Sequence, residues 1–148
     1  TVSVDDATLF LARFKNGALG SFEATRFAAG RRNHNRFEIN GSKGSIAFNL
    51  EKMNELQFYS RDDEDHIQGF REIIVNEESH PYMGAWWPPG HIIGWEHTFV
   101  HEIKDFLEAA AGNRKVSPDF KEGVKVQAVL EASSESARSG RWRKVPKV

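Results

Sequence analysis

Residues 81–106 read P-Y-M-G-A-W-W-P-P-G-H-I-I-G-W-E-H-T-F-V-H-E-I-K-D-F, and this stretch separates a strand-forming part of the chain from a helix-forming part. It holds three of the four tryptophans and three of the five prolines. Leaving so many rings in water is costly, so the segment either covers a hydrophobic core or lines a binding pocket. The residues alone favour the two alternatives about equally.

Before this stretch, apolar and polar side chains alternate in short runs between turn residues, which is the pattern of β-strands. Asn16-Gly17 predicts a two-residue hairpin turn, and Gly41 to Gly44 predict a second tight turn. Tight turns join antiparallel neighbours, so the sheet should be largely antiparallel. The predicted strands are residues 8–14, 18–28, 36–40, 46–50, 56–59 and 70–75.

After this stretch, apolar residues recur at helical spacing from Trp95 to Ala110 and predict an amphipathic helix that ends near Gly112. Ser117-Pro118 predicts the start of a second helix, which Gly140 should end. Residues 141–145 alternate basic and apolar side chains and predict a final edge strand. Strands followed by helices predict an α+β fold, with an open, mostly antiparallel sheet of about six or more strands and helices covering one face.

The length of 148 residues suits a single domain over residues 1–148. The uncovered sheet face would carry Arg36, Glu38 and Asn40, so we expect it to be hydrated or to pair with a second subunit. The net charge of -1 argues against a nucleic-acid partner or an anionic membrane surface. With no run of about 18 apolar residues, we expect no membrane partner and, by default, a cytoplasmic protein.

His97 and His101 lie four residues apart on the predicted first helix, the spacing of a zinc-ligand pair. They lie opposite the apolar arc of that helix and share their face with Lys104 and Glu108. Since a lysine is repelled by a metal cation, a solvated or interface face is the favoured interpretation. A stand-alone binding module that holds a metal through these histidines stays the alternative.

The loop Trp86-Trp87-Pro88-Pro89-Gly90-His91 has a second possible role besides covering a core. C–H surfaces of a sugar or polyol stack on aromatic rings, while its hydroxyls need polar partners such as a histidine. The loop supplies both kinds of group within six residues. It therefore offers one wall of a sugar site, or a plug at the end of the sheet.

Five segments in this order resemble the C-terminal domain of the Gfo/Idh/MocA family, which includes glucose-fructose oxidoreductase and inositol dehydrogenase. They are residues 6–14, N-G-A-L-G-S-F-E-A-T-R at 16–26, F-E-I-N-G-S-K-G-S-I-A-F at 37–48, F-L-E-A at 106–109 and V-L-E-A-S-S-E-S-A-R-S-G-R-W at 129–142. The stretch W-W-P-P-G-H-I-I-G-W-E-H-T-F at 86–99 further resembles a branch of sugar or polyol dehydrogenases.

The resemblance implies an N-terminal Rossmann domain that binds NAD or NADP, expected before position 1. It also implies that this chain supplies part of the substrate cleft and a homo-oligomer interface on its open sheet face. The family's catalytic groups, a lysine in an E-K-P motif and a D-x-x-x-H helix, are likewise expected upstream, so no catalytic, cofactor-binding or metal residue is assigned here. We expect the chain alone to be inactive. The substrate-side candidates are Trp87, His91, Trp86, Arg26, Arg32, Asn33 and His34.

Overall fold

The computed structural model describes residues 3–112, 114–115 and 117–148. It divides into two compact units. The first unit comprises Thr1–Ala28 and Asp105–Val148, and the second comprises Ala29–Lys104. The described elements are six strands and two α-helices, with three short 3-10 helices between them, so the α+β class predicted from sequence is confirmed.

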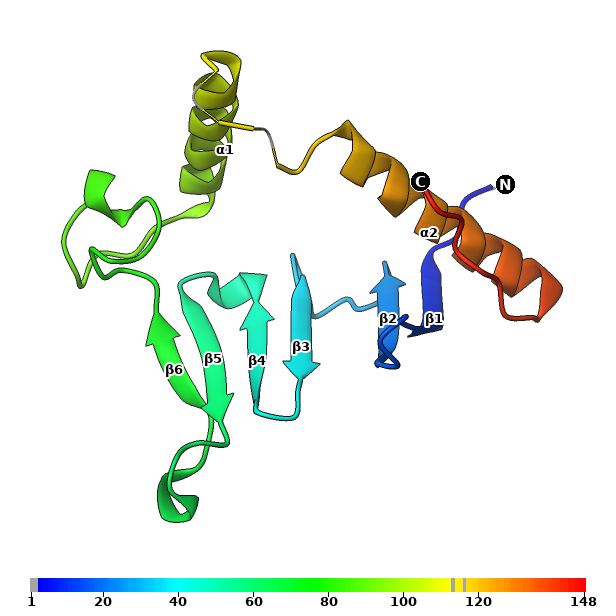
Figure 1. Cartoon of the computed structure of the whole chain (residues 1–148), viewed down its shortest axis with the longest axis horizontal. Helices are drawn as coiled ribbons and strands as arrows, with labels where there is room; N and C mark the ends of the chain where they lie inside the picture. Colours follow the sequence, from blue (N-terminus) through cyan, green and yellow to red (C-terminus); the bar gives the residue numbers. More distant parts are fainter. Residues whose placement is uncertain (1–2, 113, 116) are drawn as a thin grey trace. The chain divides into compact units, whose positions relative to one another are not determined.

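The first unit contains a two-stranded antiparallel sheet of β1 (Ala7–Arg13) and β2 (Leu19–Thr25) (Figure 1). Phe10 pairs with Phe22 across the strands, and their rings stack at 4.8 Å between centroids. The connecting turn differs from the predicted two-residue form. Phe14 N–H donates to the Ala18 carbonyl, and Gly17 adopts a φ of 90°, so three residues form the loop. A left-handed residue in such a loop is the position that glycine favours.

Helix α2 (Phe120–Ser139) also belongs to the first unit. Its N-cap is Asp119, whose carboxylate accepts a hydrogen bond from Glu122 N–H, so the helix begins after the predicted Ser117-Pro118 start. Gly140 ends it as predicted, with a φ of 64° and its N–H donated to the Ser136 carbonyl.

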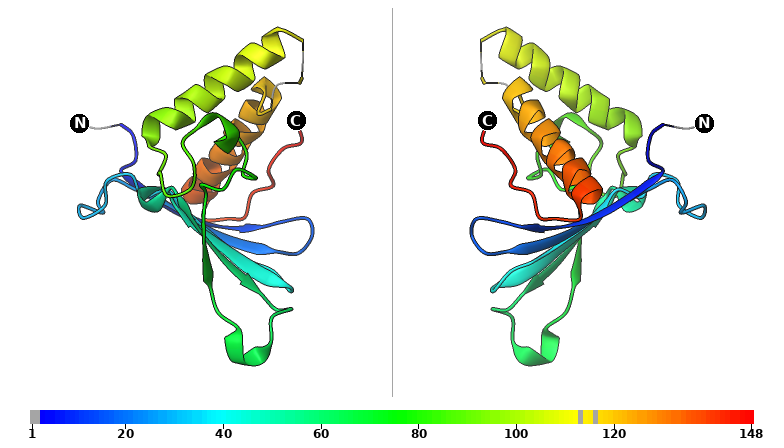
Figure 2. Two further views of the ribbon diagram at one scale, coloured as in Figure 1. Left: turned by 90° about the vertical axis from the view of Figure 1, so that its left-hand side faces the viewer. Right: turned by 90° about the vertical axis from the view of Figure 1, so that its right-hand side faces the viewer.

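The second unit is built on a four-stranded antiparallel sheet in the order β3-β4-β5-β6. Its strands are β3 (Arg36–Asn40), β4 (Gly44–Asn49), β5 (Glu55–Ser60) and β6 (Arg71–Ile74). Figure 2 shows the β5–β6 hairpin with the 3-10 helix η2 (Asp65–Ile67) at its tip. Register and side-chain alternation give this sheet an apolar face. That face carries Phe37, Ile39, Ile46, Phe48, Leu56, Phe58 and Ile73.

The opposite face of the same sheet is polar. Arg36 donates to Glu38 and Asn40 donates to the other oxygen of the same carboxylate, while Ser45 donates to Asn40 at 2.6 Å. The hydrogen bond from Asn40, reinforced by Arg36, lowers the pKa of Glu38 below its ordinary value. This face therefore carries an ordered network and not a set of independent solvated side chains.

Two predictions about the sheet need correction. The six described strands form two sheets of two and four strands and not one open sheet. Residues 26–35 join β2 to β3, and residues 30–35 among them form the polar connection that the sequence predicts, so no tight turn pairs those two strands. Residues 141–145 are not a strand. The expectation that helices cover one sheet face stays a prediction.

The aromatic stretch leads from β6 through the 3-10 helix η3 (Met83–Ala85) into α1 (Trp95–Ala110). Met83 is the buried anchor of this segment, with an exposed fraction of 4%. The helix ends two residues before Gly112, as predicted. Among the described residues, no helix has the length and apolar character needed to cross a membrane.

Candidate functional site

The two adjacent tryptophans of the aromatic loop have different environments. Trp86 is half-buried and its indole N–H donates to His101 Nε2 at 2.7 Å. Trp87 is 74% exposed. One ring therefore anchors the loop and the other is presented to solvent.

His91 completes the exposed part of this loop. Its ring lies 5.5 Å from the Trp87 ring, centroid to centroid, and its Nδ1 is 2.8 Å from the Pro88 carbonyl oxygen. A carbonyl oxygen only accepts, so Nδ1 carries the proton and the neutral ring keeps Nε2 as an acceptor. An exposed aromatic face thus lies beside a histidine acceptor of defined tautomer.

The sequence predicts a solvated or interface face for His97 and His101, and the structure does not give them the fully solvated form. Both side chains are half-buried. Gly94 N–H donates to His97 Nδ1 at 3.0 Å, and the Trp86 ring meets the His97 ring edge-on at 4.4 Å. His97 Nδ1 accepts from the Gly94 N–H and His101 Nε2 accepts from the Trp86 N–H, and each of these N–H groups can only donate. No group of three or more metal-ligating side chains occurs among the residues that the structure describes. The metal-binding alternative therefore gains no support.

Arg32, Asn33 and His34 are brought together by a residue that the sequence analysis missed, Glu51. Its carboxylate accepts hydrogen bonds from Arg32 N–H at 2.9 Å and from His34 Nδ1 at 3.3 Å. Arg31 Nη1 also lies 3.3 Å from this carboxylate. Glu51 follows β4, and Asn49 caps its 3-10 turn by accepting from Glu51 N–H. One carboxylate therefore holds the loop of candidate residues.

This arrangement has an electrostatic consequence for Glu51. The backbone hydrogen bond from Arg32 is the largest cause that lowers the pKa of Glu51, and His34 and the Asn33 backbone add to it. Each of these donors stabilises the charged form of the carboxyl group. At neutral pH the loop is thus held by an ionised group.

Arg26, the remaining candidate, belongs to the first unit. Its backbone N–H donates to the Asp6 carbonyl at 2.8 Å, just beyond the β1–β2 pairing. Its side chain is exposed. The second unit holds the other six candidates in two groups, Trp86 to His91 and Arg32 to His34.

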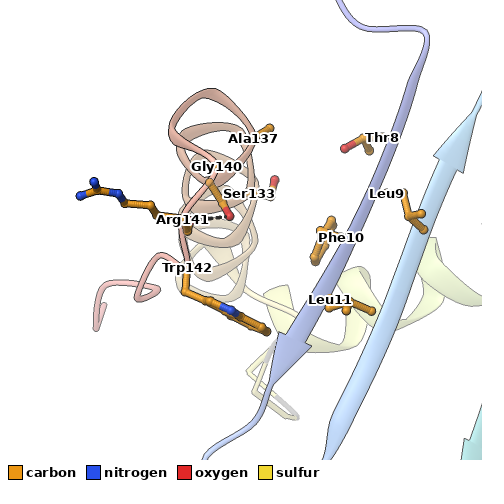
Figure 3. Close-up of a pocket in the computed structure, with 10 residues that line it drawn as sticks. Thr8, Leu9, Phe10, Leu11, Ser133, Ala137, Gly140, Arg141 and Trp142 are labelled. Carbon is orange, nitrogen blue, oxygen red and sulfur yellow. Dashed lines mark hydrogen bonds between the residues drawn. The ribbon is translucent and has the colours of Figure 1, made fainter.

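A shallow groove of about 330 Å³ lies in the first unit, between β1 and the end of α2, and none of the seven candidates lines it. Figure 3 shows Trp142 extending toward the strand and Arg141 pointing away from it. The Arg13 guanidinium lies 5.8 Å from the Trp142 ring. The groove is lined by Thr8, Leu9, Phe10, Leu11, Ser133, Ser136, Ala137, Gly140, Arg141 and Trp142. With no acid or histidine among these residues, we assign it no chemistry.

Asp62 and His66 have the spacing of the D-x-x-x-H motif, but the structure gives them a different setting. They lie near the tip of the β5–β6 hairpin, where η2 (Asp65–Ile67) is the only helical turn within residues 61–70. The His66 side chain is 75% exposed and lies 3.5 Å from Glu64. These two residues therefore do not share a helix face, and no catalytic role is assigned to them.

The chain matches the family model described as the oxidoreductase family, C-terminal alpha/beta domain, over residues 2–145. It is 43% identical to levoglucosan dehydrogenase of Pseudarthrobacter phenanthrenivorans, in a match that covers 99% of this chain and 38% of that protein. The structure is also similar to that of an oxidoreductase domain protein from Kribbella flavida, with 51% identity and a TM-score of 0.95. That match covers 99% of this chain and 39% of the Kribbella chain.

A levoglucosan dehydrogenase structure in complex with NADH and levoglucosan is similar as well, with 42% identity and a TM-score of 0.94. It is matched over 99% of this chain and 40% of its own. The chain thus spans about two fifths of the length of these relatives. By the match of the family model over nearly all of its residues, the chain belongs to the Gfo/Idh/MocA oxidoreductase family, as its C-terminal alpha/beta domain.

Proposed function

We propose that this chain is the substrate-binding and subunit-pairing domain of an NAD(P)-dependent sugar or polyol dehydrogenase. Hydride transfer from a carbinol carbon to the nicotinamide belongs to the full-length protein, and the chain alone is inactive. The observation that carries the proposal is the Trp87–His91 pair, an exposed indole face beside an imidazole acceptor. The match to a dehydrogenase whose structure holds NADH and levoglucosan supports the substrate class.

The pair suits a sugar for a simple chemical reason. Axial C–H groups of a pyranose stack on an indole, and a neighbouring hydroxyl can donate to His91 Nε2. The Pro88 carbonyl holds the imidazole in the required tautomer before any substrate arrives. Preorganised groups of this kind cost less entropy on binding than flexible ones.

The residues of this chain do not suit the dinucleotide itself. The sequence contains no G-x-G-x-x-G motif, and every strand pair in the described sheets is antiparallel. Dinucleotide sites of the Rossmann type need a parallel strand-turn-helix unit with that glycine pattern. The proposed NAD or NADP would therefore be held by a Rossmann domain outside this chain.

We assign the subunit-pairing role to the polar face of the four-stranded sheet. Its network of Arg36, Glu38, Asn40 and Ser45 presents charged and hydrogen-bonding groups in fixed positions. Paired polar groups in fixed geometry suit a specific interface, because they discriminate between registers as well as attract.

The proposal is tested in the full-length enzyme with the substitution Trp87→Ala. We expect the KM for the sugar to rise roughly threefold to tenfold, since an aromatic stacking contact contributes about 0.5–1.5 kcal/mol. Trp87→Phe should retain much of the affinity because it keeps an aromatic face. Steady-state kinetics with levoglucosan, the sugar in the structure of the relative, provide the measurement.

Trp142→Ala is the matched control, because Trp142 is also well exposed, at 67%, and is not one of the substrate-side candidates. Its kinetic constants should stay within about twofold of the parent enzyme. An unchanged KM in Trp87→Ala, or an equal rise in both variants, would refute the assignment of Trp87 to the substrate wall.

A further inference from the structure

The inner side of the aromatic loop is held by two histidines of α1. The Trp86 indole N–H, which can only donate, points to His101 Nε2 at 2.7 Å. His101 must therefore accept at this nitrogen, so its neutral ring carries the proton on Nδ1. The contact is directional, and it ties a side chain of the loop to the second turn of the helix.

The ring contacts around Trp86 add to this hydrogen bond. Tyr82 stacks on His101 with 4.2 Å between centroids and planes 11° apart, and the His97 ring meets Trp86 edge-on. Tyr82 adopts a φ of 67°, which costs a non-glycine residue free energy. A strained backbone at Tyr82 and a stacked ring at His101 together show that the surrounding contacts determine this end of the loop.

The other end of the loop has its own anchor. The Asn54 side chain donates to the Ile93 carbonyl at 2.8 Å and accepts from Ile93 N–H at 2.9 Å. Residues 87–92 form an arc between these two anchors, and the hydrogen bonds of this arc are internal ones from His91 to the Pro88 carbonyl. The arc carries Trp87 and His91, and its position therefore depends on the contacts of Trp86 and Ile93 at its two ends.

We propose that His101 is a positioning residue for the substrate wall. It acts through Trp86: by holding the indole of Trp86, it sets the direction in which the next residue, Trp87, presents its ring. This inference rests on the proposed function of the Trp87–His91 pair. It adds a residue of α1 to which no role in substrate binding was assigned.

The kinetic test uses the full-length enzyme with His101→Leu, His101→Gln and Trp86→Phe. We expect the sugar KM to rise about fivefold in His101→Leu and in Trp86→Phe, with kcat within about twofold. The amide oxygen of His101→Gln can accept from the indole, so this variant should recover most of the loss. The double variant Trp86→Phe/His101→Leu should be no worse than either single change, because both remove one contact.

A second measurement reads the contact itself, without substrate. Nitrogen-15 NMR of the same enzyme follows the indole N–H of Trp86, which Trp86→Phe assigns by its disappearance. We expect slow hydrogen exchange of this proton in the parent and at least tenfold faster exchange in His101→Leu. His66→Leu, at a histidine that is 75% exposed on the β5–β6 hairpin, is the matched control and should change neither readout.

The outcomes distinguish the positioning role of His101 from the proposed function of Trp87. Unchanged indole exchange in His101→Leu overturns the contact and with it the positioning role. Faster exchange with an unchanged KM also overturns the positioning role, even if Trp87→Ala still raises KM and upholds the proposed function. If Trp87→Ala leaves KM unchanged while the indole exchange responds as expected, the proposed substrate wall fails and the positioning role falls with it.

Discussion

Glu51 shows how one side chain organises a loop whose residues are far from it in sequence. Its partners Arg31, Arg32 and His34 lie 20, 19 and 17 residues before it. The loop holds three of the substrate-side candidates, so Glu51 positions them without being one. Hydrogen bonds from a backbone N–H and an imidazole both stabilise its ionised form.

This leads to a prediction about pH. The pKa of Glu51 is lowered in the folded protein, below its ordinary value of 4.5. The ionised carboxylate therefore contributes stability that is present above the unfolded pKa and is lost as the pH falls through the folded pKa. We expect Glu51→Gln to lower the urea midpoint at pH 7 and to lose less stability than the parent between pH 5 and about pH 3.

Glu78→Gln is the control, since Glu78 is exposed in the loop after β6. Its urea midpoints should follow those of the parent at each pH. If Glu51→Gln and the parent lose equal stability on acidification, the carboxylate of Glu51 does not hold the loop in the way described.

At the scale of elements, strands β4 and β5 of the second unit approach so closely that one position has no room for a side chain. Gly44 begins β4 and pairs with Ser60 of β5. A Cβ at Gly44 would lie 2.3 Å from the Tyr59 carbonyl oxygen, which belongs to the backbone and cannot rotate away. The glycine is therefore required by space in the sheet and not by a left-handed backbone.

We accordingly expect Gly44→Ala to destabilise the protein by about 1–3 kcal/mol, the usual cost of forcing extra volume into a packed site. Chemical denaturation followed by circular dichroism measures the change. Gly69→Ala is the matched control, because its Cβ would meet nothing within 4 Å. That variant should stay within about 0.5 kcal/mol of the parent. Equal stability of the two variants would show that the β4–β5 approach is looser than in the structure.

At the scale of the whole molecule, the chain buries few of the described side chains fully and matches only part of its relatives. Few side chains are fully buried among the described residues, with Ala47, Met83 and Ala132 as the buried apolar ones. The chain also covers only about two fifths of its relatives. The partial match supports the proposed role as one domain of a longer enzyme.

The proposed pairing through the polar sheet face makes a prediction at this scale. We expect the parent protein to self-associate at micromolar concentration. In Glu38→Lys, which reverses the charge at the centre of the network, the Kd of self-association should rise by about tenfold or more. Sedimentation velocity measures the self-association of the parent and of the variant. Glu64→Lys makes the same charge change at a site that is 78% exposed on the β5–β6 hairpin and should have no effect. A parent protein that stays monomeric would contradict the pairing role.

Local patterns in the sequence were sufficient to predict the elements and much of their pairing. Short apolar runs, period-two alternation and turn residues placed the six described strands to within a few residues, and Gly140 marked the end of α2. These features depend on backbone conformation and on the side-chain period, which neighbouring residues determine. The match of the family model likewise confirms the resemblance seen in five segments.

Tertiary structure decided the features that depend on residues far apart in the chain. The sequence placed His97 and His101 opposite the apolar arc of α1, but could not show that the Trp86 loop folds back onto that side. It held no signal that Glu51 would meet Arg32, or that Asn54 would bind Ile93 at a separation of 39 residues. The sequence alone therefore determined which rings and polar groups the aromatic loop carries. Only the fold determined that Trp86 is held and Trp87 is presented, because hydrogen bonds between distant residues leave no periodic pattern in the sequence.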